Sequence, residues 1–278
     1  MKQLSLLAGI LLIITACSTT TVLETPGVSD FDMDSDDPLT EVASSAGFQT
    51  LEEENYYLYS GVDEEHLYVI AEIRSRAFQQ RIEDYGLRLS VESSSSWLGL
   101  TYPMGMLEAL VDFQDAAVSY LLDPAWQQMP QNESIVEQAE EDIEHLALLS
   151  QNPDESPARI TLTELRAQNL EVRYQYEGGF YTIAYRIPLE SGRSQQFSPD
   201  AHAGEALSVE LTVAPPSAED ITGEELSGAA ASDFGGNMAG GRRQQEPQQD
   251  QQEETLADRV DRILGRSYSN NFIIQLPE

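Results

Sequence analysis

The most regular arrangement of chemically active side chains is an acidic run near the N-terminus. Aspartates occupy alternate positions, and a glutamate follows twelve positions into the run: Asp30, Asp32, Asp34, Asp36 and Glu41. Alternating carboxylates closed by a glutamate suit a calcium loop, because the hard Ca²⁺ ion takes six to eight oxygen ligands. Ser35, however, stands where such a loop needs glycine for its sharp turn. We therefore favour an acidic, solvated segment and keep a calcium site as the alternative.

The only cysteine lies at the end of an apolar N-terminal stretch. Residues 4–14 are almost wholly apolar, too short a run to span a bilayer and typical of the core of a signal peptide. Ile14–Cys17 resembles the bacterial lipobox, in which an aliphatic residue and two small residues precede the lipidated cysteine. We expect residues 1–16 to be removed and Cys17 to carry the lipid at the new N-terminus.

Lipidation would hold the chain on a membrane without a transmembrane helix, because several acyl chains together anchor firmly. Ser18, and not aspartate, follows the cysteine, which favours the outer membrane of a Gram-negative bacterium. The alternative is an ordinary secretory signal cut at Thr15-Ala16, with Cys17 unmodified. One cysteine excludes a disulfide framework and a multi-thiolate metal centre.

Three large aromatic residues are candidates for a ligand-binding face: Trp97, Tyr102 and Trp126. Trp97 follows the serine run 93–96, a predicted loop, and exposed aromatic residues on the loops of a rigid scaffold commonly carry recognition. The alternative is that all three belong to the core. Six further tyrosines at strand spacing are interpreted as packing residues and not as stacking platforms: Tyr57, Tyr59, Tyr174, Tyr176, Tyr181 and Tyr185.

The elements that must position these residues are mostly strands. Residues 55–60 and 66–73 are rich in aromatic and β-branched residues, and residues 87–92 alternate apolar and polar side chains. Residues 170–176 and 180–187 flank Glu177-Gly178-Gly179, the strongest hairpin signal in the chain. With residues 207–213, these short strands and turns predict a mainly β protein, an antiparallel β-sandwich.

Helices are expected to interrupt the strands at about 105–150. Apolar residues between Met106 and Leu122 fit one helix, and those between Ile135 and Ala147 form one apolar stripe of a second. This inserted helix pair is interpreted as a cap on an open end of the sheets or, alternatively, as a lid or partner-docking arm.

The C-terminal part changes composition twice. Residues 214–254 are rich in Gly, Ala, Gln and acids, which predicts a disordered loop. Residues 255–278 then contain a short amphipathic helix and a last strand near 272–276. We expect this strand to re-enter the same sheet; docking on another protein is the alternative.

The charge balance limits the partners. The chain of 278 residues has 48 acidic and 15 basic side chains, a formal net charge of −33. This excludes nucleic acid, whose binding requires a basic surface. Lys2 is the only lysine and leaves with the signal peptide, so the mature chain resembles proteins of salt-loving bacteria; an acidic surface protein from an ordinary organism is the alternative.

Several segments resemble a known family. Asp63–Val69 looks like the turn and strand that open carbohydrate-binding module family 9 and DOMON sandwiches, and Gly99–Pro103 and the late strand Tyr181–Ile187 look like segments of uncharacterised bacterial exported proteins of this type. The resemblance covers roughly residues 50–215 and implies the sandwich fold. The sugar-binding members stack paired tryptophans on the sugar, but neither Trp97 nor Trp126 aligns with that pair. The histidines that a haem-binding member would use are isolated here: His66, His145 and His202.

Together these features predict a lipid-anchored envelope protein with a tether at 17–49 and a sandwich at 50–213. None of the common catalytic sequence motifs is present, so we expect no enzyme. The predicted function is non-catalytic binding of a glycan or another envelope component, without a cofactor unless calcium binds the acidic run. The alternative is a structural or assembly lipoprotein that docks on an envelope complex through its helical insertion and C-terminal helix.

Overall fold

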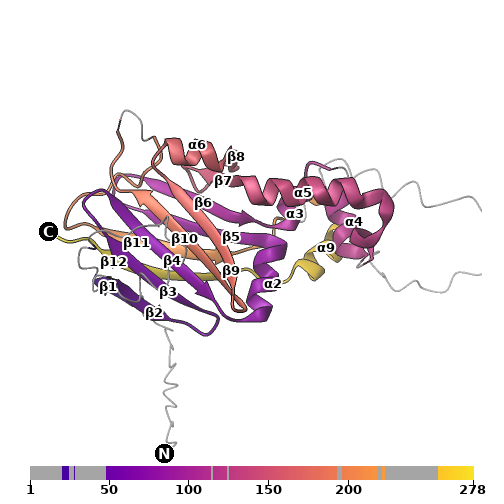
Figure 1. The fold of residues 1–278 in the computed structure, drawn as a ribbon, viewed down its shortest axis with the longest axis horizontal. Coiled ribbons are helices and arrows are strands. Elements are labelled where there is room, and N and C mark those ends of the chain that lie inside the picture. Colours follow the sequence, from indigo (N-terminus) through magenta and orange to yellow (C-terminus); the bar gives the residue numbers. More distant parts are fainter. Residues whose placement is uncertain are drawn as a thin grey trace, which may run out of the picture.

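A computed structural model describes residues 21–24, 28, 48–113, 115–123, 125–192, 196–217, 221–222 and 256–278. Two sheets pack face to face, and the helices other than α6 (Leu162–Ala167), which lies beside β7 (Leu146–Ser150) and β8 (Ala158–Thr161), gather at the end of the sandwich opposite the C-terminus (Figure 1). The fold is mainly β and its sheets are mostly antiparallel, which confirms the predicted β-sandwich.

The larger sheet contains seven strands in the order β1-β12-β11-β5-β6-β7-β8. Their bounds are β1 Thr21–Glu24, β5 Gly86–Glu92, β6 Trp97–Met104, β7 Leu146–Ser150, β8 Ala158–Thr161, β11 Ala206–Val213 and β12 Tyr268–Gln275. Every neighbouring pair is antiparallel except β1 and β12, which are parallel. The last strand therefore re-enters the same sheet, as expected.

The smaller sheet contains five antiparallel strands in the order β2-β3-β4-β10-β9. Their bounds are β2 Gln49–Glu52, β3 Tyr56–Val62, β4 His66–Ile73, β9 Glu171–Glu177 and β10 Phe180–Pro188. β9 lies at the edge of this sheet, so one side of it has no neighbouring strand among the described residues.

The main core lies between the two sheets and follows the strand alternation. In β5, Leu87, Leu89 and Val91 are buried in this core, while the alternate side chains point to the outer face. Tyr185 of β10 is fully buried, and its hydroxyl donates to the backbone oxygen of Tyr102 at 2.7 Å, which links the two sheets.

The helices have clear local causes. Helix α2 (Arg76–Tyr85) begins at the cap Ser75 and ends at Gly86, and α6 (Leu162–Ala167) begins with a capping box between Thr161 and Glu164. The other helical segments are α3 Met106–Leu110, α4 Ala116–Leu122, η1 Trp126–Gln128, η2 Pro130–Asn132, α5 Glu133–His145 and α9 Leu256–Leu264. No described helix is long and apolar enough to cross a membrane.

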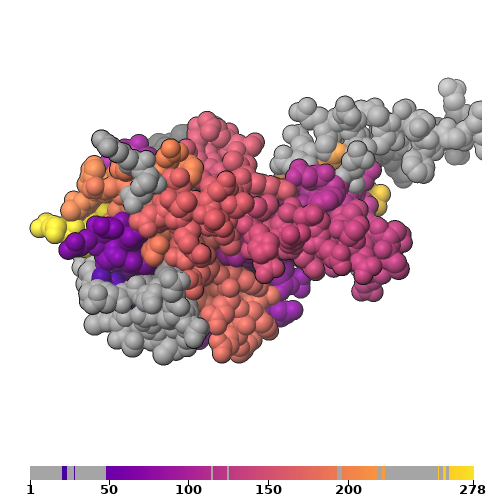
Figure 2. Space-filling view, turned by 45° about the horizontal axis from the view of Figure 1, so that its top comes forward, coloured from indigo at the N-terminus to yellow at the C-terminus, as the bar shows by residue number. Residues whose placement is uncertain are grey.

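The insertion differs from the expected helix pair. Its first part is two short helices, α3 and α4, and its last five residues, Leu146–Ser150, form strand β7 instead of continuing α5. A second apolar cluster joins α3, α4 and α5 to Val260 and Leu264 of α9. The insertion, magenta in Figure 2, thus projects beyond the sandwich and packs on the C-terminal helix of its own chain.

The predicted tether also contains structure. Thr21–Glu24, assigned to it from composition, form β1 beside β12, and Leu23 is buried in the main core. Val28 is buried as well, and its N–H donates to the backbone oxygen of Val62 at 2.6 Å. Cys17, the acidic run Asp30–Glu41 and most of the predicted disordered loop at 214–254 lie outside the described residues.

Candidate functional site

The three aromatic residues predicted to share a binding face lie apart. Tyr102 is buried in the main core and Trp126 in the apolar cluster of the insertion. Trp97 is half-buried at the start of β6. Burial therefore removes Tyr102 and Trp126 from any surface site, and Trp97 alone stays a candidate.

A different set of aromatic side chains is exposed. Among the described residues the exposed large hydrophobic side chains are Val22, Tyr174, Tyr176, Phe180 and Ile263. The aromatic members of this set all belong to the β9–β10 hairpin, where they are 39%, 57% and 40% exposed in sequence order. In Figure 2 this hairpin, in salmon, projects at the lower edge of the molecule.

The hairpin is shaped by its turn and held by α2. Gly178 and Gly179 both have positive φ, 60° and 90°, as a tight two-residue turn requires. Gln79 of α2 is buried, and its side-chain amide donates to the backbone oxygens of Ile73 at 2.9 Å and Gly179 at 2.8 Å. The helix thus fixes the tip of the hairpin to the preceding strand β4.

Tyr174, Tyr176 and Tyr181 form one tyrosine surface on the hairpin. The ring of Tyr181 lies 5.1 Å from that of Tyr174 and 4.9 Å from that of Tyr176, both edge to face. The Tyr181 hydroxyl donates to Glu83 of α2, and Arg76 of the same helix lies 3.7 Å from Glu83. The surface therefore combines aromatic rings with one carboxylate and one guanidinium.

The phenols of Tyr174 and Tyr181 are neutral. Burial, followed by the hydrogen bond and charge of Tyr181, raises the pKa of Tyr174. Burial and the hydrogen bond to Glu83 likewise raise the pKa of Tyr181. These hydroxyls stay protonated at any physiological pH, so they can donate and accept hydrogen bonds without adding charge.

Phe180 belongs to the opposite face of the same hairpin. There the guanidinium of Arg74 lies 5.5 Å from the Phe180 ring and 3.9 Å from the Tyr57 ring. Arg74 is also paired with Glu72. Phe180 is thus an exposed aromatic residue of the hairpin that belongs to a separate, arginine-stacked cluster.

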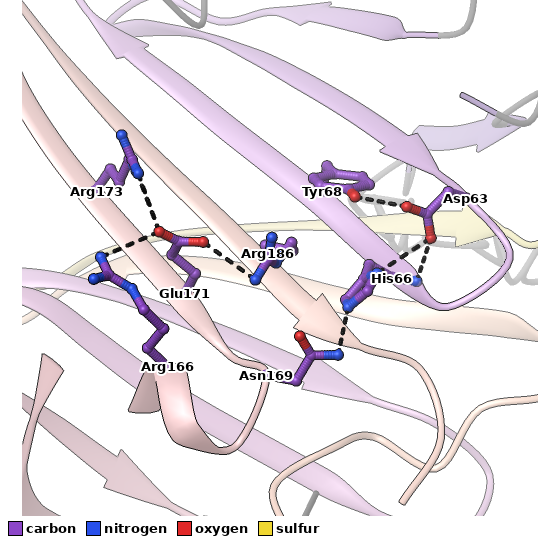
Figure 3. A network of polar contacts seen from close by, with 8 residues as sticks. All are labelled: Asp63, His66, Tyr68, Arg166, Asn169, Glu171, Arg173 and Arg186. Carbon is purple, nitrogen blue, oxygen red and sulfur yellow. Dashed lines mark hydrogen bonds and ion pairs between the residues drawn. The ribbon is translucent and has the colours of Figure 1, made fainter. Parts of the chain in front are cut away.

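A buried carboxylate fixes the start of the edge strand. Glu171 of β9 is only 5% exposed and pairs with Arg166 of α6 at 3.3 Å, Arg173 of β9 at 3.2 Å and Arg186 of β10 at 3.2 Å (Figure 3). Three cations compensate the dehydration of one anion, which would otherwise be costly. This network joins β9 to its neighbours just before the strand reaches Tyr174.

A second polar network continues to the β3–β4 turn. Asp63 accepts hydrogen bonds from the Tyr68 hydroxyl at 2.6 Å and from the backbone N–H of His66 at 2.6 Å, and Asn169 Nδ2 lies 2.8 Å from His66 Nε2 (Figure 3). Burial raises the pKa of Asp63, but these hydrogen bonds outweigh it and hold the pKa below its usual value. The network orders the turn and fits a structural role.

A cavity of about 530 Å³ lies near this turn. Its lining includes Asp63, Glu64, Glu190 and Glu278 together with aliphatic side chains, and neither an aromatic ring nor an arginine belongs to it. In the described part of the chain no cluster of three or more His, Cys, Asp or Glu could hold a metal ion. The predicted calcium ligands Asp30, Asp32, Asp34, Asp36 and Glu41 lie outside the described residues, so the calcium site stays a prediction.

Sequence reasoning missed the tyrosine surface. It interpreted all four tyrosines of this hairpin as packing residues; Tyr181 and Tyr185 are buried, whereas Tyr174 and Tyr176 pack on Tyr181 but are exposed. The available signal was the pair of tyrosines two residues apart just before the Gly178-Gly179 turn. It could have been recognised only with the knowledge that β9 is an edge strand.

The comparisons with known proteins concern the fold. No family model matches the chain, and no curated protein matches it. Similar solved structures include a carbohydrate-binding module of family 9 from Caldicellulosiruptor kristjanssonii in complex with glucose, at 10% identity and a TM-score of 0.33 over 72% of this chain and 81% of that one. A presumed carbohydrate-binding protein from Bacteroides uniformis is 9% identical, with a TM-score of 0.37 over 71% of this chain and 85% of that one.

The same family 9 module in complex with cellotriose gives 10% identity and a TM-score of 0.32, over 72% of this chain and 78% of that one. The β-sandwich fold rests on the strand topology of this chain, and the resemblance to carbohydrate-binding module family 9 stays a prediction. Glucose and cellotriose are ligands of that module, and the site of the present chain rests on its own residues.

Proposed function

We propose that this chain is a non-catalytic glycan-binding protein of the cell envelope, with the tyrosine surface as its binding site. The observation that carries the proposal is that two of the three exposed aromatic rings of the described residues, Tyr174 and Tyr176, lie on one face of the β9–β10 hairpin. Exposed apolar patches on a folded protein commonly mark interaction sites, and tyrosine offers both an apolar ring and a hydroxyl.

The geometry suits a sugar chain. Tyr174 and Tyr176 are two residues apart on one strand, so their Cα atoms are separated by roughly 6–7 Å and their side chains point to the same face. Glu83 and Arg76 stand beside them and can accept and donate hydrogen bonds to hydroxyl groups. The ends of the strand are fixed by the Glu171 network and by Gln79, so the surface is ordered before a ligand arrives.

The test is thermal unfolding of the full chain in molar KCl with a panel of oligosaccharides that includes cellotriose. A ligand at a hundred times its dissociation constant should stabilise the fold by about 2.7 kcal/mol, a shift of several degrees. The double variant Y174A/Y176A should lose the shift. The matched control is Phe180→Ala, which removes a ring about as exposed as that of Tyr174 from the opposite face of the same hairpin and should keep the shift.

Two results would refute this proposal. One is the absence of a shift with every oligosaccharide of the panel, and the other is a shift that survives in Y174A/Y176A.

The envelope location belongs to the proposal too, and it rests on the lipobox-like Ile14–Cys17. Replacing Cys17 by serine should move the protein from the membrane fraction to the soluble fraction.

The second candidate function is docking on an envelope complex through the insertion and the C-terminal helix. The apolar side chains of α9 are already engaged, because Val260 and Leu264 are buried against the insertion of the same chain. Ile263 is the one large apolar side chain described as exposed on this helix. This leaves less apolar surface for a partner than the tyrosine surface offers.

A further inference from the structure

The outer face of the seven-stranded sheet contains a groove, distinct from the tyrosine surface. Its volume is about 400 Å³, within the range of small-molecule sites. Three neighbouring strands supply its floor: Arg88 of β5 pairs in register with Thr101 of β6 and with Thr212 of β11. Glu108 of α3 and the pair Pro215-Pro216 also line it. We name it the arginine groove.

Arg88 is unusual among the arginines of this acidic chain. The other half-buried arginines of the described sheets are all paired with carboxylates: Arg159 with Asp112 and Asp142, and Arg173 and Arg186 with Glu171. Arg88 is half-buried as well, but it makes no hydrogen bond or ion pair with any described residue. Burial lowers its pKa, while the charge of Glu210 opposes this. Arg88 thus lines the groove, and its guanidinium has no described hydrogen-bond acceptor.

Trp97 holds this guanidinium in place. The indole lies across Gly99, where a Cβ atom would come within 2.3 Å of Trp97 Cη2, so only glycine lets the ring lie this close to the strand. The Arg88 guanidinium carbon is 5.0 Å from the centre of the same ring. Trp97 does not line the groove itself. It acts as a positioning residue that covers one side of Arg88 and restricts its motion.

We propose that the arginine groove binds a hydroxylated carboxylic acid about the size of one sugar ring, such as a uronic acid. The carboxylate would accept two parallel hydrogen bonds from Arg88, the planar fork for which arginine is suited. The hydroxyls of the ligand would meet the hydroxyls of Thr101 and Thr212 and the carboxylate of Glu108, and Pro215-Pro216 would cover its apolar edge. Glu210, the acid diagonal to Arg88, already accepts a hydrogen bond from Ser269.

The net charge of −33 sets the conditions for this binding. Long-range repulsion between the chain and an anion is largely screened in molar salt, where the Debye length is about 3 Å. A half-buried contact with Arg88 is screened much less. Uronate binding should therefore be at least as strong in about 1 M KCl as in about 0.1 M KCl.

Intrinsic fluorescence tests the proposal, because the chain has only two tryptophans. The full chain with Trp126→Phe leaves Trp97 as the single indole. Titration with glucuronate should change its emission saturably, and glucose should not. In this background Arg88→Gln should weaken glucuronate binding at least tenfold. The matched control is Arg266→Gln, which removes an equal charge from an exposed position outside the groove and should bind as the parent does.

Arg88→Lys is a second variant, needed in case Arg88→Gln fails to fold. It keeps the positive charge but loses the planar fork, so it should also bind glucuronate more weakly than the parent does. An emission change that glucose produces equally, or that survives in both Arg88 variants, would overturn the proposal, as would the absence of any change with glucuronate. The tyrosine surface is tested separately, because Y174A/Y176A should leave the glucuronate signal of Trp97 intact.

Discussion

Glu205 is half-buried, and its carboxylate joins two backbone segments. One of its oxygens accepts from the backbone N–H of Ser94 at 2.7 Å and the other from that of His202 at 3.1 Å. Ser94 lies in the loop before β6, and His202 lies in the turn before β11. The hydrogen bonds, that from Ser94 foremost, stabilise the charged form and lower the pKa of Glu205 to about 2.

This pKa makes a pH-dependent contribution to stability. Because the folded pKa lies below the unfolded value of about 4.3, the contribution is present above the unfolded pKa and is lost as the pH falls through the folded one. Glu205→Gln should therefore lower the urea midpoint at pH 7, and its difference from the parent should shrink between about pH 5 and pH 2. Glu64→Gln, at an exposed turn position, removes the same charge and is measured beside it as the control. A Glu205 difference that stays constant with pH would contradict this assignment.

Residue type alone did not decide which aromatic side chains are buried. Tyr174 and Tyr185 both occupy alternating strand positions, yet the first is exposed and the second is fully buried. The reason is that β10 has a neighbour on each side while β9 forms the edge of the sheet. Sequence alternation predicts which side chains share a face, but it does not predict how far the opposite sheet extends over that face. The tyrosine surface could not be located without this information.

At the scale of elements, the hairpins were the most predictable part and the insertion the least. The turn at Glu177–Gly179 was recognisable because glycine is needed at positive φ. β7 was mistaken for the end of a helix because Leu146 and Leu148 face the insertion while Ala147 and Leu149 face the main core. A strand buried on both faces has no polar alternation, so a helical stripe fits it equally well.

Helix α9 provides the test of whether the insertion is a cap. Leu264 is 3% exposed within the apolar cluster of the insertion, and its backbone oxygen accepts from the Tyr85 hydroxyl at 2.9 Å. Leu264→Ala should lower the free energy of unfolding by about 2–5 kcal/mol, because it leaves a cavity in a packed cluster. The neighbouring Ile263→Ala removes an exposed side chain and should change it by about 0.5 kcal/mol or less.

Urea unfolding of the two variants provides the measurement. If Leu264→Ala proved as mild as Ile263→Ala, α9 would not be packed on the insertion in solution. Its apolar face would then be available to a partner, and the docking function would gain support over glycan binding.

At the scale of the molecule, the two proposed sites lie on different sheets. The tyrosine surface belongs to the edge of the five-stranded sheet, and the arginine groove lies on the outer face of the seven-stranded sheet. The first is an open, neutral aromatic surface and the second a small groove with one guanidinium. An extended glycan and a single acidic sugar unit could therefore bind at the same time, without competing for the same residues.

The whole chain carries a charge that works against compactness. With a net charge of −33, mutual repulsion destabilises the folded state most at low ionic strength. We expect the melting temperature at pH 7 to rise steadily as KCl increases from about 0.1 M to about 2 M, because the Debye length falls from about 10 Å to below about 3 Å. Thermal unfolding followed by circular dichroism measures this rise.

The control for this salt effect is the same titration near pH 4.1, the isoelectric point of the sequence. There the net charge is close to zero, so screening has little repulsion to remove and the rise should largely disappear. If the melting temperature rose equally with KCl at both pH values, KCl would act by a route other than screening. The acidic composition would then give no reason to place the protein in a salt-loving organism. If the melting temperature rose with KCl only at neutral pH, the fold would depend on salt because of its charge, as adaptation to high salt predicts.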